Sequence, residues 1–174
     1  MGSMTSSAIV EGLKAGGLIV GCQILVHSSL SSFGHVEGGT DAVIDALLAA
    51  VGIEGTVLVP TLTGSEKLSP DNPPVFDPVN SACWTGKIPE TFRKRSNAMR
   101  SLHPTHSVAA IGADAHELIK DHWYSVTPCD ESSPYGKLAQ RPNGYILLIG
   151  VDHESSTMFR DQTKVGAKRL NRRS

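Results

Sequence analysis

Residues 40–60 read T-D-A-V-I-D-A-L-L-A-A-V-G-I-E-G-T-V-L-V-P. The first twelve repeat apolar side chains at helical spacing: Val43, Ile44, Leu47, Leu48 and Val51. Thr40 is a candidate N-cap, Asp41 adds an acidic first turn, and Gly52 is a stop signal. The run at 55–60 is short, apolar and rich in valine, which is typical of a buried strand. This stretch therefore predicts a helix that leads directly into a strand.

The same alternation continues on both sides of this stretch. Strands are predicted at 23–27 (Q-I-L-V-H), 106–111 (H-S-V-A-A-I) and 145–151 (Y-I-L-L-I-G-V). The last of these is apolar throughout, as expected of a strand buried on both faces. Helices are predicted at 7–15, from Pro89 to about Arg95, at 113–122 and at 134–140. Alternating helices and strands predict an α/β domain, in which ligands bind at the C-terminal ends of strands.

Composition excludes several classes of protein. The chain has 174 residues, 40% hydrophobic and 19% charged, enough for one ordinary domain, expected over 1–162. Its three cysteines form no C-x-x-C pair, which argues against a disulfide framework and a cysteine zinc site. No apolar run reaches the roughly 18 residues of a membrane span, and Glu11 and Lys14 interrupt any signal-peptide core. A cytoplasmic protein that binds no membrane is expected.

Charge is unevenly distributed along the chain. The net charge of −1 excludes a nucleic-acid binder that works by general basicity. Five of the 16 basic residues lie at 163–174, where there is no acidic one, which leaves −6 for residues 1–162. The acidic body would attract a small cationic substrate. The basic tail could be a nucleic-acid or membrane patch, but frayed termini are more common, so 163–174 is predicted to be disordered.

Several catalytic signatures are missing. The sequence has no G-x-G-x-x-G after a strand, no G-x-x-x-x-G-K-[ST], no G-x-S-x-G and no H-E-x-x-H. His103 and His106 could share a metal ion, but no carboxylate is close to them in sequence, and no metal site is predicted. Residues 64–83 form a long, proline-rich, irregular segment, and such a loop usually has a function or is mobile.

Small hydroxyl residues follow the predicted strands. They are Ser28, Ser29, Ser31, Ser32, Thr61, Thr63 and Ser107. Beside exposed backbone N–H groups, such residues suit a phosphate or an extended amide-bearing ligand. They also commonly cap turns and helices. Taken alone, they predict a polar site at the strand ends of an α/β domain and nothing narrower.

The order of the motifs along the chain allows a narrower prediction than the hydroxyl residues alone. The series comprises V-H-S-S-L-S-S-F-G (26–34), G-T-V-L-V-P-T-L-T (55–63), F-D-P (76–78), G-K-I-P-E-T-F-R (86–93), R-S-L-H-P-T-H-S-V-A-A-I-G (100–112), S-P-Y-G-K-L (133–138) and G-Y-I-L-L-I-G-V (144–151). In this order they resemble the aminoglycoside 3-N-acetyltransferase family, also called the antibiotic N-acetyltransferases, from about Ser7 to about Thr157. The resemblance implies a layered α/β/α domain with a central mixed sheet. It also implies an enzyme of antibiotic resistance that transfers acetyl from acetyl-CoA to an amine of an aminoglycoside, without a metal.

The resemblance also implies site residues. Those along acetyl-CoA are His27, Ser28, Ser29, Thr61, Thr63, Ser107 and Val108. Thr61, Thr63 and His103 are implied near the acetyl group, and Arg100 near the same site. Asp77 and Asp130 lie in segments that resemble substrate-facing loops, although turn capping is the more common role of such residues.

One departure concerns the general base. The family's base resembles the last residue of a T-x-x-H motif, with Glu three residues later, but here Arg160 and Thr163 occupy those positions. Arginine stays protonated near neutral pH and cannot act as a base. The family also continues beyond this length, so the C-terminal part is expected to be missing through truncation or an altered reading frame. Two functions are therefore predicted: the acetyltransferase, its activity open in this form, or an inactive CoA-binding module or non-functional fragment. An incomplete sheet would expose an edge and favour self-association.

Overall fold

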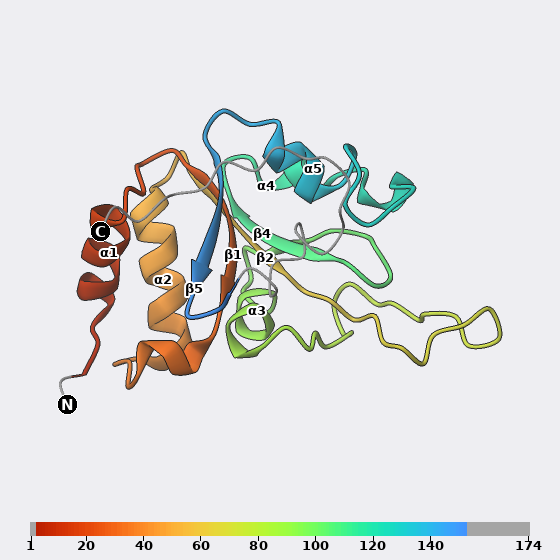
Figure 1. Ribbon diagram of the computed structural model, residues 1–174, viewed down its shortest axis with the longest axis horizontal. Coiled ribbons are helices and arrows are strands. Elements are labelled where there is room, and N and C mark those ends of the chain that lie inside the picture. The colour runs from red at the N-terminus through yellow and green to blue at the C-terminus, as the bar shows by residue number, and fades with distance from the viewer. Residues whose placement is uncertain (1–2, 153–174) are drawn as a thin grey trace.

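The computed structural model describes residues 3–152, so the predictions for Arg160 and for 163–174 lie outside the described residues. The helices are α1 (Ser6–Ala15), α2 (Gly39–Val51), α3 (Lys87–Phe92), α4 (Ala115–Ile119) and α5 (Pro134–Ala139), with 3₁₀ turns η1 (Leu30–Phe33) and η2 (His122–Tyr124). The strands are β1 (Gln23–Ser28), β2 (Thr56–Pro60), β3 (Met99–Arg100), β4 (Val108–Gly112) and β5 (Gly144–Ile149). Figure 1 shows their arrangement.

The five strands form one mixed sheet in the order β3-β4-β2-β1-β5. Strand β1 pairs in parallel with both β2 and β5, whereas β4 is antiparallel to β2 and to β3. The predicted mixed sheet is therefore confirmed. Strand β3 is the one that sequence analysis did not predict, because two residues carry no periodic signal.

Helices cover both faces of the sheet, as an α/β/α arrangement requires (Figure 1). Alternate residues of β1 point to opposite faces: Ile24 and Val26 pack in one core with α1, α2 and α3, and Leu25 packs in the other with α4 and α5. Both cores are fully buried at their centres. The alternation of side chains in a short apolar strand thus builds the two layers.

Strand β5 is less buried than its sequence suggested. All six of its residues are only partly buried, although Tyr145, Leu147 and Ile149 pack against the first core. The reason is its position, since among the described strands β5 pairs with β1 alone and lies at the edge of the sheet. The prediction of a strand buried on both faces is therefore wrong.

The N-cap of helix α2 is Gly38 rather than Thr40, so the helix begins two residues earlier than that cap predicts. Gly38 and Gly39 have φ values of 79° and 61°, a left-handed conformation that favours glycine and brings the chain into the helix without a side-chain cap. Asp41, inside the first turn, accepts a hydrogen bond from Arg95 at 2.8 Å. This contact joins α2 to the turn that follows α3.

Candidate functional site

The polar residues predicted at the strand ends lie together at one end of the sheet, where the parallel strands finish. Strands β1, β2 and β5 run in parallel and finish at this end, and the antiparallel β4 begins there. The hydroxyls of Thr61 and Ser107 are 2.9 Å apart, and Ser107 Oγ donates to the carbonyl of Thr61 at 2.7 Å. Both residues are fully buried. The topology therefore brings two of the predicted hydroxyls into direct contact.

Arg100 binds this pair from β3. Its Nε lies 3.1 Å from both hydroxyls, and Nη2 donates to the carbonyl of Thr61 at 2.9 Å. Its Nη1 donates to the carbonyl of Ser81 at 2.6 Å, and the guanidinium lies 4.9 Å from the centre of the Phe76 ring. Burial lowers the pKa of Arg100, but a guanidinium stays charged at any ordinary pH. Arg100 thus ties the loop at 76–81 to the ends of the strands.

A cavity of about 1170 Å³ opens beside this end of the sheet. His27, Ser28 and Ser29 line it, together with Pro60 and Leu62 from the end of β2. His27 is 8% exposed, and burial lowers its pKa to about 4, so the ring is uncharged near neutral pH. Its Nε2 and the hydroxyl of Ser28 are buried and have no hydrogen-bond partner among the described residues. Buried polar groups are almost always paired, so these two atoms are available to a hydrogen-bond partner that enters the cavity.

The other predicted acetyl-CoA residues lie behind the cavity wall. Thr61 stands between two cavity-lining residues, but its side chain is buried against Ser107. Thr63 donates its hydroxyl to the carbonyl of Pro104 at 2.6 Å. Val108 is buried in the core between the sheet and helices α4 and α5. Thr61, Thr63 and Val108 are therefore not among the cavity-lining residues of the described structure.

His103 belongs to a group of histidines behind the site. Its Nδ1 accepts hydrogen bonds from the backbone N–H groups of Thr105 and His106, at 3.2 and 3.0 Å. Its ring lies 4.7 Å from that of His122, which is fully buried. Burial is the main cause that lowers the pKa of His103, and it lowers that of His122 to about 3. Within residues 3–152, no three His, Cys, Asp or Glu side chains converge as a metal ion would require.

Asp77 and Asp130 each cap a turn. Asp77 accepts hydrogen bonds from the side chain and backbone of Asn80 and the backbone of Val79, which lower its pKa. The carboxylate of Asp130 accepts hydrogen bonds from backbone groups of residues 126, 127, 132 and 133 and from the hydroxyls of Ser132 and Ser125. Burial opposes ionisation of Asp130, but these hydrogen bonds outweigh it and lower its pKa. Neither carboxylate is among the residues that line the cavity in the described part of the chain.

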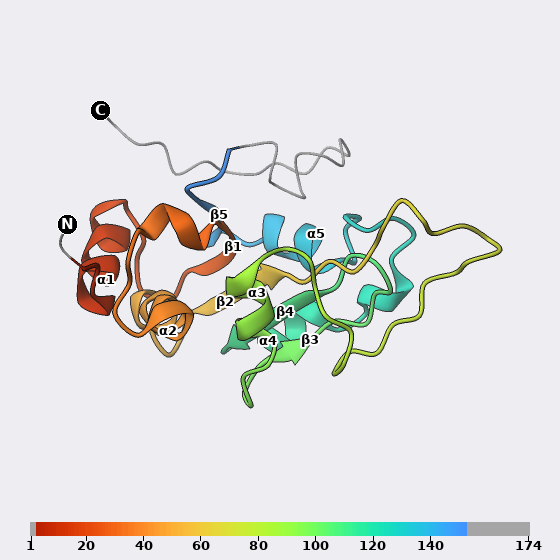
Figure 2. The same cartoon turned by 90° about the horizontal axis from the view of Figure 1, so that it is seen from below.

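The irregular loop and the residues after it supply cavity residues that the sequence did not mark as candidates. Ser65, Glu66 and Leu68 come from the loop, Trp84 follows it directly, and Lys87 is the first residue of α3. The loop leaves the end of β2, extends well away from the sheet and returns to α3, as both views show (Figures 1 and 2). Its length and proline content indicated a functional loop. No periodic pattern marked which of its side chains face the cavity.

Comparison with known proteins assigns the family. The profile of the aminoglycoside 3-N-acetyltransferase family matches residues 25–160. The chain is 39% identical, over 173 residues, to the SPbeta prophage-derived aminoglycoside N(3')-acetyltransferase-like protein YokD of Bacillus subtilis, covering 89% of this chain and 63% of that protein. The chain belongs to the aminoglycoside 3-N-acetyltransferase family, a family of acyltransferases. It thus spans somewhat less than two thirds of this relative.

Solved structures agree with this assignment. The crystal structure of YokD aligns with a TM-score of 0.80 at 36% identity, covering 89% of this chain and 68% of that one. AAC-IIIb with CoASH aligns at 0.73 and 31% identity, covering 84% and 59%. A variant of AAC(3)-IVa in complex with gentamicin aligns at 0.79 and 31% identity, covering 88% and 57%. Within residues 3–152, no helix has the length and apolarity needed to cross a membrane.

Proposed function

We propose that this chain is an aminoglycoside 3-N-acetyltransferase that transfers the acetyl group of acetyl-CoA to an amine of an aminoglycoside. The observation that carries the proposal is the cavity where the parallel strands end, which His27 and Ser28 line with buried polar atoms that have no hydrogen-bond partner among the described residues. The solved relatives with CoASH and with gentamicin support both ligands.

The residues present fit acetyl-CoA, which supplies a thioester as the acetyl donor. Its pantetheine arm is an extended chain with amide groups, and the unpaired atoms of His27 and Ser28 are suitable hydrogen-bond partners for amides. We assign His27, Ser28 and Ser29 to this arm. Thr61, Ser107 and Val108 act through the wall that they support, with Thr63 and His103 in the same turn region.

The acceptor side has its own requirements. A protonated amine is not a nucleophile, so a base must take up a proton, and donors must meet the charge that develops on the carbonyl oxygen. Arg160, at the position that the resemblance gives to the base, lies outside the described residues, and its guanidinium stays protonated near neutral pH. Turnover by this chain therefore depends on another proton acceptor, which makes binding and catalysis separate questions.

Two measurements test the proposal. Release of CoA thiol from acetyl-CoA in the presence of gentamicin is expected to exceed the rate without gentamicin. Calorimetry with CoA is expected to show saturable binding. Binding without turnover would identify an inactive CoA-binding module. The absence of both would leave a non-functional fragment and would overturn the proposal.

We further propose that residues 1–162 form one domain, that the protein acts in the cytoplasm, where acetyl-CoA is available, and that it can self-associate. The layered packing of residues 3–152 supports the first. The outer edge of β5, which has no partner strand among the described residues, supports the last. A monodisperse monomer in light scattering would contradict self-association.

A further inference from the structure

Trp84 is unusually exposed for its size. Its side chain lines the cavity, and the residue is 61% exposed. The indole N–H donates to the carbonyl of Gly64 at 2.7 Å, and the backbone N–H donates to the carbonyl of Leu62 at 3.1 Å. The polar edge of the ring is therefore satisfied by the opposite arm of the loop. Trp84 thus places a largely exposed aromatic ring, held by this hydrogen bond, at the cavity.

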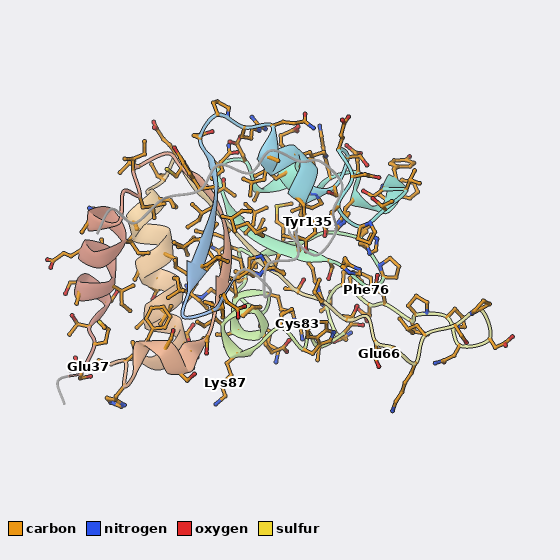
Figure 3. All side chains as sticks on the ribbon, viewed as in Figure 1. Glu37, Glu66, Phe76, Cys83, Lys87 and Tyr135 are labelled. Atoms are coloured by element: carbon orange, nitrogen blue, oxygen red, sulfur yellow. The ribbon has the colours of Figure 1, made fainter. Side chains whose placement is uncertain are left out.

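Glu66 lies two residues beyond Gly64, whose carbonyl accepts the hydrogen bond of the indole. It is exposed, lines the same cavity, and makes no hydrogen bond or ion pair with any residue of the described part of the chain. This distinguishes it from Glu90, whose carboxylate binds both Arg93 and Lys94. Figure 3 places Glu66 on the outgoing arm of the loop and Cys83, the neighbour of Trp84, on the returning arm. A carboxylate without an ion-pair partner in the described part of the chain and an exposed aromatic ring thus line the same cavity.

We propose that Trp84 and Glu66 form the part of the cavity that holds an ammonium group of the acceptor. A cation is attracted to the face of an indole, the best of the aromatic side chains for this contact, and Glu66 supplies the counter-charge. This inference rests on the proposed function but concerns the cationic acceptor and not acetyl-CoA. Lys87, which Figure 3 shows on the far side of Cys83 from Glu66, would repel the same cation and leaves its own side of the cavity to an anionic ligand.

The two tryptophans of the chain allow a direct test. Trp123→Phe leaves Trp84 as the sole tryptophan, and gentamicin has no aromatic ring to interfere with its emission. Titration of this variant with gentamicin is expected to change the emission saturably, and added salt should weaken the effect. Since a cation–aromatic or carboxylate contact contributes up to about a tenfold change in affinity, Glu66→Gln and Trp84→Leu are each expected to raise the Kd for gentamicin several-fold, and Trp84→Phe less.

Controls separate this inference from the proposed function. Glu131→Gln removes an exposed carboxylate that does not line the cavity and should leave gentamicin binding unchanged. None of the variants should alter the CoA affinity measured by calorimetry, and unchanged circular dichroism would confirm their folding. Gentamicin affinity that is unaffected by both Glu66→Gln and Trp84→Leu would overturn the inference. If the chain binds CoA but gentamicin leaves Trp84 emission unchanged, the inference alone fails, whereas binding of neither ligand refutes the proposed function as well.

Discussion

Thr61 and Ser107, 46 residues apart in sequence, are joined by a hydrogen bond of 2.9 Å between their hydroxyls. The pair fixes the end of β2 to the residue before β4, and Arg100 binds both hydroxyls. Since Ser107 Oγ donates to the carbonyl of Thr61, the hydroxyl of Thr61 must donate to Ser107. The two hydroxyls, the carbonyl of Thr61 and the guanidinium of Arg100 thus form one connected set of hydrogen bonds.

The first prediction concerns this cluster. Ser107→Ala leaves the hydroxyl of Thr61 without its acceptor and removes one acceptor of Arg100, so the free energy of unfolding should fall by about 1–3 kcal/mol. Urea unfolding followed by circular dichroism measures it. Ser96→Ala, which removes an exposed hydroxyl, should change stability by less than about 0.5 kcal/mol. Equal unfolding midpoints for the two variants would contradict the prediction.

The second prediction concerns pH. Burial lowers the pKa of His122 from 6.5 to about 3, so the folded protein keeps this ring neutral at a pH where the unfolded chain binds a proton. Stability is therefore full above pH 6.5 and is lost as pH falls from there toward 3. At pH 5 the loss from one such ring is roughly 2 kcal/mol. Urea unfolding of the unsubstituted chain at pH 7 and pH 5 should show it.

His122→Gln provides the comparison for this pH effect. Glutamine cannot titrate, so the variant should lose less stability between pH 7 and pH 5, even though it is less stable than the parent at pH 7. His27, whose pKa burial lowers to about 4, contributes in the same direction and keeps a residual slope in the variant. An identical pH dependence in parent and variant would show that His122 is not the group responsible.

The third prediction separates stability from binding at His27. Its Nε2 is buried without a partner among the described residues, and replacing an unpaired polar group with an apolar one costs little stability or increases it. His27→Leu should therefore unfold at the same or a higher urea concentration, while its Kd for CoA rises about fivefold through the loss of one hydrogen bond. His35→Leu, at an exposed position, should leave CoA binding unchanged. Tight CoA binding by His27→Leu would remove His27 from the site.

The fourth prediction distinguishes two roles for Asp130. Because its carboxylate accepts at least five hydrogen bonds from its own turn, Asp130→Ala should lower stability by about 1–3 kcal/mol. Glu131→Ala, its exposed neighbour, should have little effect. A substrate-facing role would give the opposite pattern: stability close to that of the parent, and weaker gentamicin binding in calorimetry.

Much of the sheet could be predicted because apolar runs mark strands directly. The predicted positions of β1, β2, β4 and β5 agree with the structure to within about two residues. The burial of β5 could not be predicted, since it depends on which strands pair with it and not on its own residues. The start of α2 also differs from the prediction. The helix is entered through the left-handed backbone of Gly38, whereas Thr40 is the residue whose side chain could have capped it.

The candidate site was only partly predictable. Hydroxyls at strand ends marked the end of the sheet where the cavity lies, and Thr61 and Ser107 meet there. Which of them faces the cavity depends on how each strand end twists, and that is not encoded in residue type. Glu66 comes from an irregular loop and Trp84 follows it directly, and no periodicity in this segment relates position to direction.

The long loop is hydrogen-bonded to the rest of the domain near its two ends, and not in its middle at 67–75. Trp84 binds Gly64, Thr85 donates its hydroxyl to the carbonyl of Pro60 at 2.6 Å, and Arg100 binds the carbonyl of Ser81. Between these ends, the segment at 67–75 is held mainly by a small turn of its own, in which Ser69 and Asn72 pair. Insertions, deletions or new side chains at 67–75 would therefore leave the domain intact, so evolution can change what this part of the loop contacts without refolding the protein.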